Sequence, residues 1–413
     1  MKTSRLSLAL ITTLALSGSV YADDASEITQ LKKEMQELRE VTKSLIDETS
    51  DLKSGFNYTT VDTEKSYNGL GSAASKVYYS SSPLSIGGYG EMYYANENSE
   101  GKRTSKLDVY RFVPYIGYKF SDNIILNTEL EFEHGGVANN DGVAEGGEVI
   151  LEFMYLDFLI NPHANLRVGH FLIPMGLINE KHEPTLFTTV QRPETSKYIL
   201  PTTWHESGVM VYGDIIDNIS YKVAGVSALQ TGINGSKWIR NGRGESFEQT
   251  DPNLGGVARL DYTGINGLLV GGSAYYAPSV NGYNSATTIV DAHLDYKIGG
   301  ARVYGTYAQT SRSNADEIAA NAVESAQGGY INMSYDLLSL TSSADSLPIF
   351  VQFESYNPEE KRVDGTAGDK TDITTIGINY FPHEQVVLKL DYAVKSKGSV
   401  DGDTASISMG FIF

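Results

Sequence analysis

The sequence predicts an all-β protein, a transmembrane antiparallel β-barrel of about 16 strands, preceded by a short α-helical coiled-coil segment. The chain opens with an export signal. Its last residues alternate between apolar and polar up to an aromatic C-terminus, and short alternating segments fill the region between. Past the signal, no stretch approaches the roughly 20 apolar residues that a helix needs to cross a bilayer. Only helices and closed barrels satisfy their backbone in lipid, so the mature chain is either soluble or a barrel.

The first element is a signal peptide, residues 1–22. Met1–Arg5 is basic, Leu6–Leu16 is apolar but too short to span a membrane, and Val20 and Ala22 occupy the positions that a signal peptidase reads. We expect cleavage after Ala22 and export of the mature chain. A barrel in an exported chain places the protein in the outer membrane of a Gram-negative cell, in contact with outer-membrane lipid.

Composition narrows the possible partners. The formal net charge is −19, and it becomes −21 once Lys2 and Arg5 leave with the signal peptide. Such a charge argues against nucleic acid as a partner. The chain has no cysteine, so no disulfide stabilises it, and a closed barrel needs none because it has no edge strands. The 41 glycines and 27 tyrosines suit strands, turns and interfacial aromatic girdles.

Residues 23–53 read as a periplasmic coiled coil. Their apolar and threonine positions recur in steps of three and four, flanked by charged residues, at Ile28, Leu31, Met35, Leu38, Thr42, Leu45, Thr49 and Leu52. About four heptads of this kind favour a coiled coil over the alternative, a lone amphipathic helix lying on another surface. The heptads alone do not set the number of helices in the coiled coil.

Residues 54–83 are rich in serine, glycine and tyrosine, and 70–76 is a run of mostly small residues without a clear period. The segment reads as a linker. An alternative is that it folds into the barrel or plugs its periplasmic mouth, because long structureless segments are often functional.

Residues 84–413 form the predicted barrel domain. The expected strands are 84–96, 106–120, 124–135, 147–160, 165–173, 206–215, 218–228, 254–263, 267–277, 286–297, 300–310, 325–336, 347–356, 371–381, 385–396 and 403–413. Their connections alternate between tight turns and longer polar loops, as outer-membrane barrels require. One turn, 337–346, is long where a short one is expected.

Alternation assigns the two faces of the strands. In 124–135, Leu126 and Leu130 face one side, while Glu129, Glu131 and Glu133 face the other. A Lys or Arg on the lipid face costs about 2–4 kcal/mol at the midplane, so the charged faces must look into a lumen. About sixteen strands enclose an aqueous channel, which implies transport.

The longest loop, 174–205, is rich in apolar and aromatic residues for an exposed loop. We expect it to fold into the barrel as a constriction, since loops of this length in compact domains are usually functional. The alternative is an outer loop packed on a trimer neighbour. The candidate constriction residues are Lys181, His182, Glu183, Arg192, Lys197 and His205.

Several segments resemble outer-membrane porins related to the phosphate-selective, O/P-type porins: Gly87–Glu91, Arg111–Val113, Gly147–Val149, Arg167–Gly176, Asn179–Pro184 and Pro201–Trp204. The coiled coil is similar to that of some trimeric dicarboxylate-uptake porins. The resemblance spans residues 84–413 and is strongest between 87 and 212. It implies a trimer of sixteen-stranded channels for small hydrophilic solutes, often anions.

The arginine ladder of the phosphate-selective members does not carry over. The pore-lining candidates are scattered and of both signs: Arg111, Glu129, Glu131, Glu133, Arg167, Arg259, Arg302 and Lys389. A ring of one sign selects the opposite ion, so a mixed lining predicts a weakly selective pore. Each charge could instead hold the loop to the wall by ion pairs.

Enzymatic motifs are missing from the sequence: it has no Gly-rich phosphate loop, no GxSxG elbow, and no pair of histidines at metal-ligand spacing. The predicted function is therefore a passive porin, neither an enzyme nor a cofactor-binding protein. The alternative is a non-transport barrel, either an adhesin or a structural envelope protein. The aromatic Phe413 resembles the C-terminal residue that outer-membrane assembly machinery recognises.

Overall fold

The computed structural model describes residues 30, 32–43, 45, 61–137, 146–279 and 282–413. The chain divides into two compact units, Met1–Phe56 and Asn57–Phe413. The predicted signal peptide, residues 1–22, lies outside the described residues. Within the described part of the chain, no helix has the length and apolar character needed to span a membrane.

In the first unit, residues 32–43 are helical, within the range predicted as a coiled coil. Met35 and Leu38 are 54% and 67% exposed. The remaining heptad positions lie partly outside the described residues, so the coiled coil stays a prediction.

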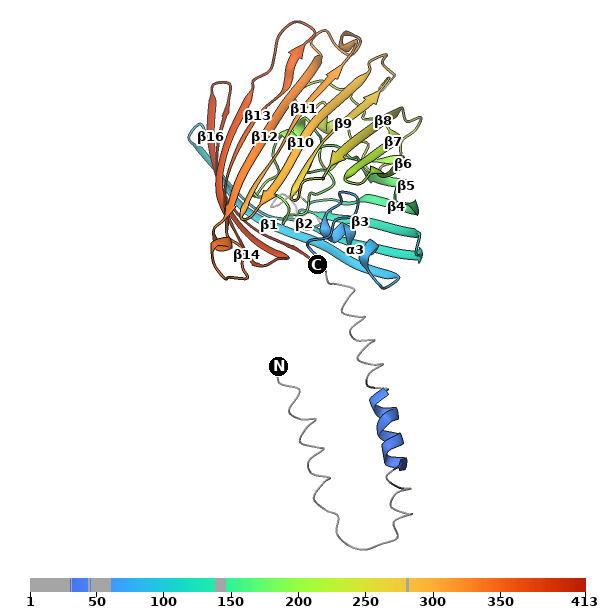
Figure 1. Cartoon of the computed structure of the whole chain (residues 1–413). Coiled ribbons are helices and arrows are strands. Elements are labelled where there is room, and N and C mark those ends of the chain that lie inside the picture. The colour runs from blue at the N-terminus through green and yellow to red at the C-terminus, as the bar shows by residue number, and fades with distance from the viewer. Residues whose placement is uncertain (1–29, 31, 44, 46–60, 138–145, 280–281) are drawn as a thin grey trace. The chain divides into compact units, whose positions relative to one another are not determined.

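The second unit is a closed antiparallel barrel. Among its described residues, sixteen strands pair in chain order and β1 pairs with β16 (Figure 1). The elements are α3 Ser72–Tyr79, β1 Leu84–Ser99, β2 Lys102–Ser121, β3 Ile124–Glu133, β4 Val149–Asn161, β5 Ala164–Leu172, α4 Thr195–Tyr198, β6 His205–Ile216, β7 Ile219–Ser227, η1 Arg240–Gly242, β8 Leu254–Tyr262, β9 Leu268–Ala277, β10 Thr287–Ile298, β11 Ala301–Arg312, η2 Ala315–Glu317, β12 Val323–Asp336, η3 Leu337–Leu340, β13 Pro348–Arg362, β14 Thr371–His383, β15 Val386–Lys397 and β16 Val400–Ile412. The predicted fold class and strand number are confirmed.

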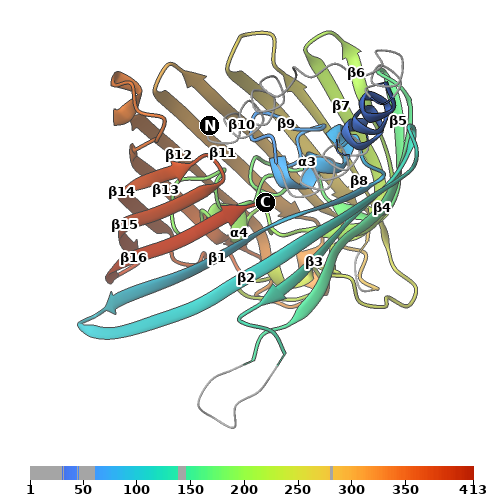
Figure 2. The ribbon, with the colours of Figure 1, turned by 90° about the horizontal axis from the view of Figure 1, so that it is seen from below.

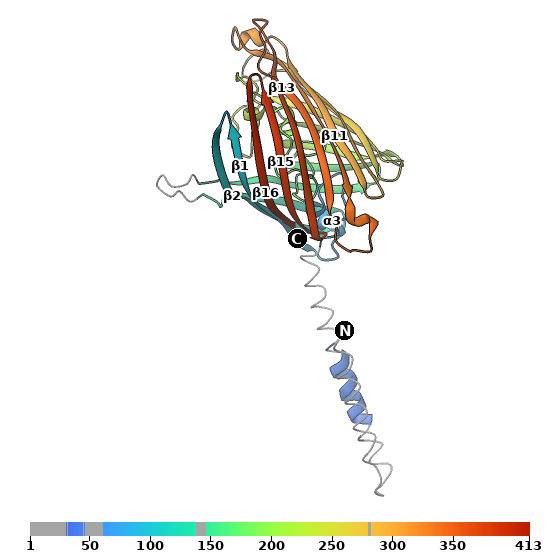
Figure 3. The ribbon, with the colours of Figure 1, turned by 90° about the vertical axis from the view of Figure 1, so that its left-hand side faces the viewer.

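The two ends of the barrel sequence close it. β1 and β16 lie side by side in Figure 3, in a register that runs from Tyr89 opposite Ile412 to Ser99 opposite Gly402. Beyond the last strand residue, the amide of Phe413 donates to Gly88 O and the amide of Gly88 donates to Phe413 O, both at 2.9 Å. An even number of strands makes this pairing possible, because it returns both ends to one side.

We call the barrel end with Leu84 and Phe413 the terminal rim, and the opposite end the loop rim. Most connections at the terminal rim are tight. The connection 337–347 is long and contains η3, and it includes the predicted exception, 337–346. The Asp336 carboxylate organises that turn by accepting from Leu338 N at 3.0 Å and Leu347 N at 2.8 Å.

Some strands are longer than the alternation predicts. β1 and β2 continue past the predicted strand ends, 96 and 106, to a two-residue hairpin at the loop rim, Glu100 and Gly101. Both residues have positive φ, +50° and +80°, which is the backbone form that suits two-residue hairpins. β13 likewise extends to Arg362, into the predicted loop 357–370.

Helix α3 lies inside the barrel, in the segment predicted as a linker. Figure 2 shows it within the ring of strands, and most of its residues are buried. Asn127 Nδ2 donates to Ala74 O at 2.9 Å, and Tyr78 OH donates to Asp157 Oδ2 at 2.5 Å. The small side chains that look like a linker in the sequence let this helix approach the wall, which is the arrangement of the plug alternative.

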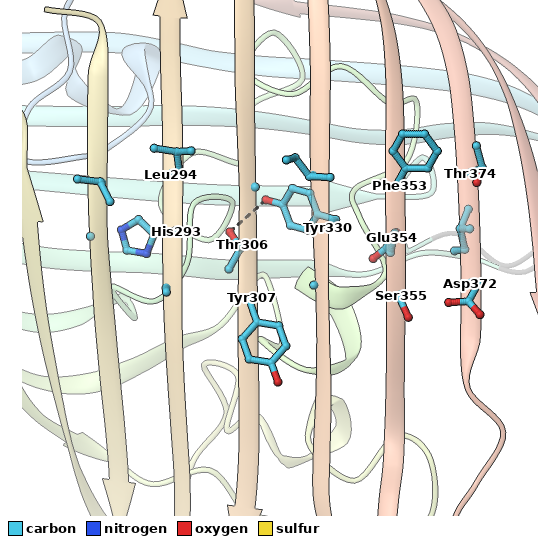
Figure 4. A pocket seen from close by; sticks show the side chains of 17 residues that line it. His293, Leu294, Thr306, Tyr307, Tyr330, Phe353, Glu354, Ser355, Asp372 and Thr374 are labelled. Atoms are coloured by element: carbon cyan, nitrogen blue, oxygen red, sulfur yellow. Dashed lines mark hydrogen bonds between the residues drawn. The ribbon is translucent and has the colours of Figure 1, made fainter. Parts of the chain in front are cut away.

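The strand register places apolar side chains outside and charged ones inside. On β15, Leu388, Leu390 and Tyr392 are exposed, whereas Lys389 and Asp391 are buried. A depression on β9–β14 belongs to this outer wall, and Figure 4 shows the outward Tyr307 and Phe353 among its lining residues. Because the charged side chains point inward, the candidate site lies on the luminal face of the strands.

Candidate functional site

The lumen is crossed by the connection between β5 and β6, residues 173–204, which we call the inner loop; it contains α4. Its apolar residues Leu177, Phe187, Ile199 and Leu200 are buried. A loop inside a barrel has no neighbouring strand for its backbone, so its amide and carbonyl groups need side-chain partners. The wall supplies them.

Cations on the wall hold the carbonyl groups of the inner loop. Arg111 on β2 donates to His182 O at 3.2 Å, and Arg259 on β8 donates to Gly176 O at 2.6 Å. On β11 and β15, Arg302 donates to Leu186 O at 3.0 Å, and Lys389 donates to Phe187 O at 2.9 Å and Thr189 O at 3.0 Å. Four pore-lining candidates therefore bind the loop.

Wall carboxylates accept hydrogen bonds from amides of the same loop. Asp391 Oδ2 accepts from Val190 N at 2.7 Å, Asp291 Oδ2 from Gly176 N at 3.2 Å, and Glu354 from Thr195 N. Together with the wall cations, these contacts hold the loop from strands all around the barrel.

Two acidic residues of the inner loop are also used structurally. Glu180 accepts from Lys222 Nζ at 2.6 and 2.7 Å. Glu183 accepts from the amides of Ala73 and Ala74 at 3.2 and 3.1 Å, at the N-terminus of α3. Since the first amides of a helix have no intrahelical partner, this carboxylate satisfies them and joins α3 to the loop.

His182 faces a cluster of carboxylates on β3 and β4. Its Nε2 lies 3.1 Å from Glu129 Oε1 and 3.3 Å from Glu152 Oε2, and its Nδ1 lies 2.8 Å from Asn179 O. Burial alone would lower the pKa of this imidazole, but the two carboxylates raise the pKa to about 10.

The other constriction candidates are dispersed. His205 begins β6 and is buried between His170, at 2.6 Å, and Glu245, at 3.3 Å. Lys181 is half-buried; burial lowers its pKa, which the nearby Asp295 carboxylate opposes. Arg192 is half-buried, and Lys197 on α4 is exposed.

A cavity of about 430 Å³ lies between the inner loop and strands β1, β2 and β13–β16. Arg192 and Glu194 line it from the loop, and Lys106, Glu354 and Lys395 line it from the wall. Lys395 Nζ is 2.8 Å from Glu194 Oε2, whereas Arg192 makes one long hydrogen bond, to Thr202 Oγ1 at 3.4 Å, and its buried Nε has no hydrogen-bond partner among the described residues. The lining is of mixed sign, and Arg192 is its most weakly held cation among these residues.

The remaining pore-lining candidates lie near charges of opposite sign. Arg167 donates to Asp157 at 2.8 and 2.9 Å. Glu131 lies 3.7 Å from Arg111, and Glu133 is opposite Arg111 in the strand register. Arg167 is therefore held to the wall, the role that the sequence left open for each charge, whereas Glu131 and Glu133 share Arg111 with Glu91.

Sequence reasoning missed Glu152. Strict alternation from Asp157, Tyr155 and Phe153 would point Glu152 outward, yet both Phe153 and Glu152 are buried. The register shift between Glu129 and Leu130, where β3 pairs β4, changes the phase of the strand. A bulge of this kind leaves no clear mark on the sequence.

Comparison with known proteins places the fold. No family model matches the chain. An uncharacterized protein of Aquifex aeolicus is 35% identical over 372 residues, which cover 84% of each chain. The anion-selective porin from Comamonas acidovorans shares 13% identity and a TM-score of 0.55, covering 80% of this chain and 99% of its own.

Two further solved structures are similar at 11% identity and TM-scores of 0.53: OmpF of Salmonella typhi in complex with daunomycin, and the outer membrane channel DcaP of Acinetobacter baumannii. Each covers 80% of this chain and 97% of its own. At these identities the likeness establishes the fold, a porin-type β-barrel.

Proposed function

The chain belongs to the same family as the uncharacterized Aquifex aeolicus protein, and we propose that it is an outer-membrane porin. In this proposal the barrel is a water-filled channel for passive diffusion of small hydrophilic solutes, with anions such as phosphate or carboxylates among them. The mature chain begins after Ala22, and the coiled coil of residues 23–53 joins three copies.

One observation carries the proposal: the charged cavity between the inner loop and the wall. Side chains from β2, β8, β11 and β15 hold the inner loop across the lumen, where it borders this cavity. In this proposal the loop narrows the aqueous lumen, and the charges that line the cavity select ions by their sign.

Whether the channel prefers anions or cations depends on which luminal charges already contact other protein groups. Arg111, Arg259, Arg302 and Lys389 are engaged with the loop, while Arg192 and Lys197 are the less engaged cations. Burial lowers the pKa of Lys197, and repulsion from Arg240 lowers it further, while Glu194 opposes the shift; a second cation therefore lies near α4 together with an acidic group. We therefore propose a weak preference for anions.

Conductance in planar lipid bilayers tests the function. The purified full-length protein should give stepwise openings, and the zero-current potential across a salt gradient should have the sign of an anion-preferring channel. A stable, correctly folded barrel without conductance would favour the adhesin or structural alternative. A cation-preferring potential would keep the porin and reject the proposed selectivity.

The coiled coil is tested by oligomeric state. Leu38 occupies a predicted core position of the heptads and is 67% exposed within the single chain. Leu38→Glu should reduce the trimer population in light scattering of the detergent-solubilised protein. Trimers of unchanged stability would mean that the barrel alone, or no coiled coil, holds the copies together.

A further inference from the structure

Three side chains from three separate elements converge on the wall of the lumen. Glu129 on β3, Glu152 on β4 and His182 on the inner loop each offer one ligand atom, and these atoms lie within 4.8 Å of one another. We propose that these residues form a site for a divalent transition-metal cation of the zinc type, which fastens the inner loop to the wall. The site is independent of the proposed transport function.

The orientation of His182 is the first support. Its Nδ1 lies 2.8 Å from the carbonyl oxygen of Asn179, and a carbonyl can only accept, so Nδ1 carries the hydrogen. In the neutral ring Nε2 is then the lone-pair nitrogen, and it faces both carboxylates. A histidine fixed by a carbonyl at one nitrogen, with the other nitrogen toward acidic groups, is the usual arrangement of a metal ligand.

The unpaired carboxylate oxygens are a second, independent observation. Both oxygens of Glu152, and Oε2 of Glu129, are buried and accept no hydrogen bond of good geometry among the described residues, although Glu152 Oε2 lies 3.3 Å from His182 Nε2. The two side chains are 1% and 0% exposed. A buried carboxylate must be paired or bind a metal, since leaving it without partners is costly. Glu152 therefore points a ligand with free lone pairs at His182.

The nearby arginine does not supply the missing charge. Arg111 is committed to Glu91, with Nη2 at 2.5 Å and Nε at 2.6 Å from the same oxygen, and it lies 3.7 Å from Glu131. Glu131 also lies against Glu152, so three carboxyl groups, Glu129, Glu131 and Glu152, stand beside one imidazole. A divalent cation offsets this excess of buried acidic groups.

Distances and donor types fit zinc. Zinc–ligand bonds of about 2.0–2.1 Å at tetrahedral angles separate two ligand atoms by roughly 3.3 Å. The observed separations from His182 Nε2 are 3.1 Å and 3.3 Å. One imidazole and two carboxylates suit zinc, whereas Mg²⁺ prefers an octahedral shell of oxygens. Three protein ligands leave one position for water or a passing solute.

A protonated His182 could bridge the same two carboxylates without a metal, so the test must separate a proton from a cation. The full-length protein, purified in detergent and freed of metal by a chelator, is titrated with Zn²⁺ and separately with Mg²⁺ by calorimetry. We expect saturable binding of Zn²⁺ to a single class of site and none of Mg²⁺. Absence of saturable Zn²⁺ binding to the folded wild type overturns the proposal and leaves the imidazolium.

Variants locate the site. Glu152→Gln and His182→Gln should each weaken Zn²⁺ binding by at least about tenfold, since even outer-shell changes cost 10–100-fold in metal affinity. The matched control is Glu354→Gln, another buried luminal carboxylate that contacts the inner loop at Thr195, and it should bind zinc like the wild type. Binding that survives both ligand variants would reject the site.

X-ray absorption on the zinc-loaded wild type gives a readout that needs no variant. The expected spectrum has one imidazole nitrogen among oxygen ligands. A shell of oxygens alone would place the ion on surface carboxylates and overturn the assignment.

Discussion

The inward cations of the barrel divide into two groups by what their side chains contact. Arg111, Arg259, Arg302 and Lys389 donate to backbone carbonyls of the inner loop and so act as structural donors. Arg192 lies on the loop itself and lines the luminal cavity with a guanidinium that is only weakly held. Solute selectivity should therefore depend on Arg192 more than on the wall arginines.

Charge reversal tests this division. Arg192→Glu and Lys181→Glu should each shift the zero-current potential toward cations, because each puts a negative charge in place of a positive one on the inner loop. Lys102→Glu makes the same charge change at the exposed hairpin tip and should leave the potential near that of the wild type. No shift for either luminal variant would mean that Lys181 and Arg192 serve only the structure.

Arg167 is the clearest structural charge. Its guanidinium group donates two hydrogen bonds to Asp157. Asp157 also accepts hydrogen bonds from Tyr78 of α3 and Tyr212 of β6. The side chains of Arg167 and Asp157 are at most 1% exposed. Removing one partner of such a pair leaves an uncompensated buried charge.

Arg167→Met should destabilise the barrel by about 3–5 kcal/mol, the usual cost of breaking a buried pair. Urea unfolding in lipid vesicles, followed by tryptophan fluorescence, measures it. Lys370→Met removes an exposed partner of Asp372 and should cost about 0–1 kcal/mol. Equal effects of the two substitutions would contradict the assigned burial.

Among the elements, α3 decides how the terminal rim is filled. Its N-terminal amides bind Glu183 of the inner loop, and its Val77 packs on the wall at Gly117 of β2. A Cβ at Gly117 would lie 2.5 Å from Val77 Cβ, so the wall is shaped for this helix. Helix and loop together form one luminal assembly.

Gly117→Val should displace α3 from the wall without opening the barrel. We expect faster hydrogen exchange of the α3 amides and a larger single-channel conductance, because the helix occupies the mouth of the lumen. Gly225→Val is the matched control, since a Cβ there meets nothing within 4 Å. If the α3 amides of Gly117→Val exchanged as slowly as those of the wild type, the contact between Val77 and Gly117 would not be what holds the helix in place.

At the scale of the whole molecule, the barrel depends on the pairing of β1 with β16. Phe413 extends that pairing by two backbone hydrogen bonds to Gly88, and its ring stacks on Phe112 with centroids 6.2 Å apart. The last residue thus seals the join between the first and last strands.

Deleting Phe413 should impair assembly more than conductance. The fraction of folded barrel in the outer membrane, measured as the heat-modifiable band on gels, should fall, while channels that do insert should conduct normally. Phe413→Tyr keeps the aromatic ring and backbone and should assemble like the wild type. Normal insertion of the truncated chain would refute a role in assembly.

Alternation along the chain was sufficient to predict the barrel, its strand number and the inward charged faces. Each strand has one face in lipid and one in water, and a period of two in the sequence records that directly. The long inner loop and the pairing of the ends also followed, from loop length and from an even strand count.

Tertiary structure alone decided which luminal charges are weakly held and which are engaged with the inner loop. Arg111 and Arg192 look equivalent in the sequence, but one holds a carbonyl and the other lines a cavity. It also decided that small residues before the barrel form α3, and that a bulge turns Glu152 toward His182. The physical reason is the same in each case: these outcomes depend on contacts between residues far apart in the chain, which a local periodicity does not record.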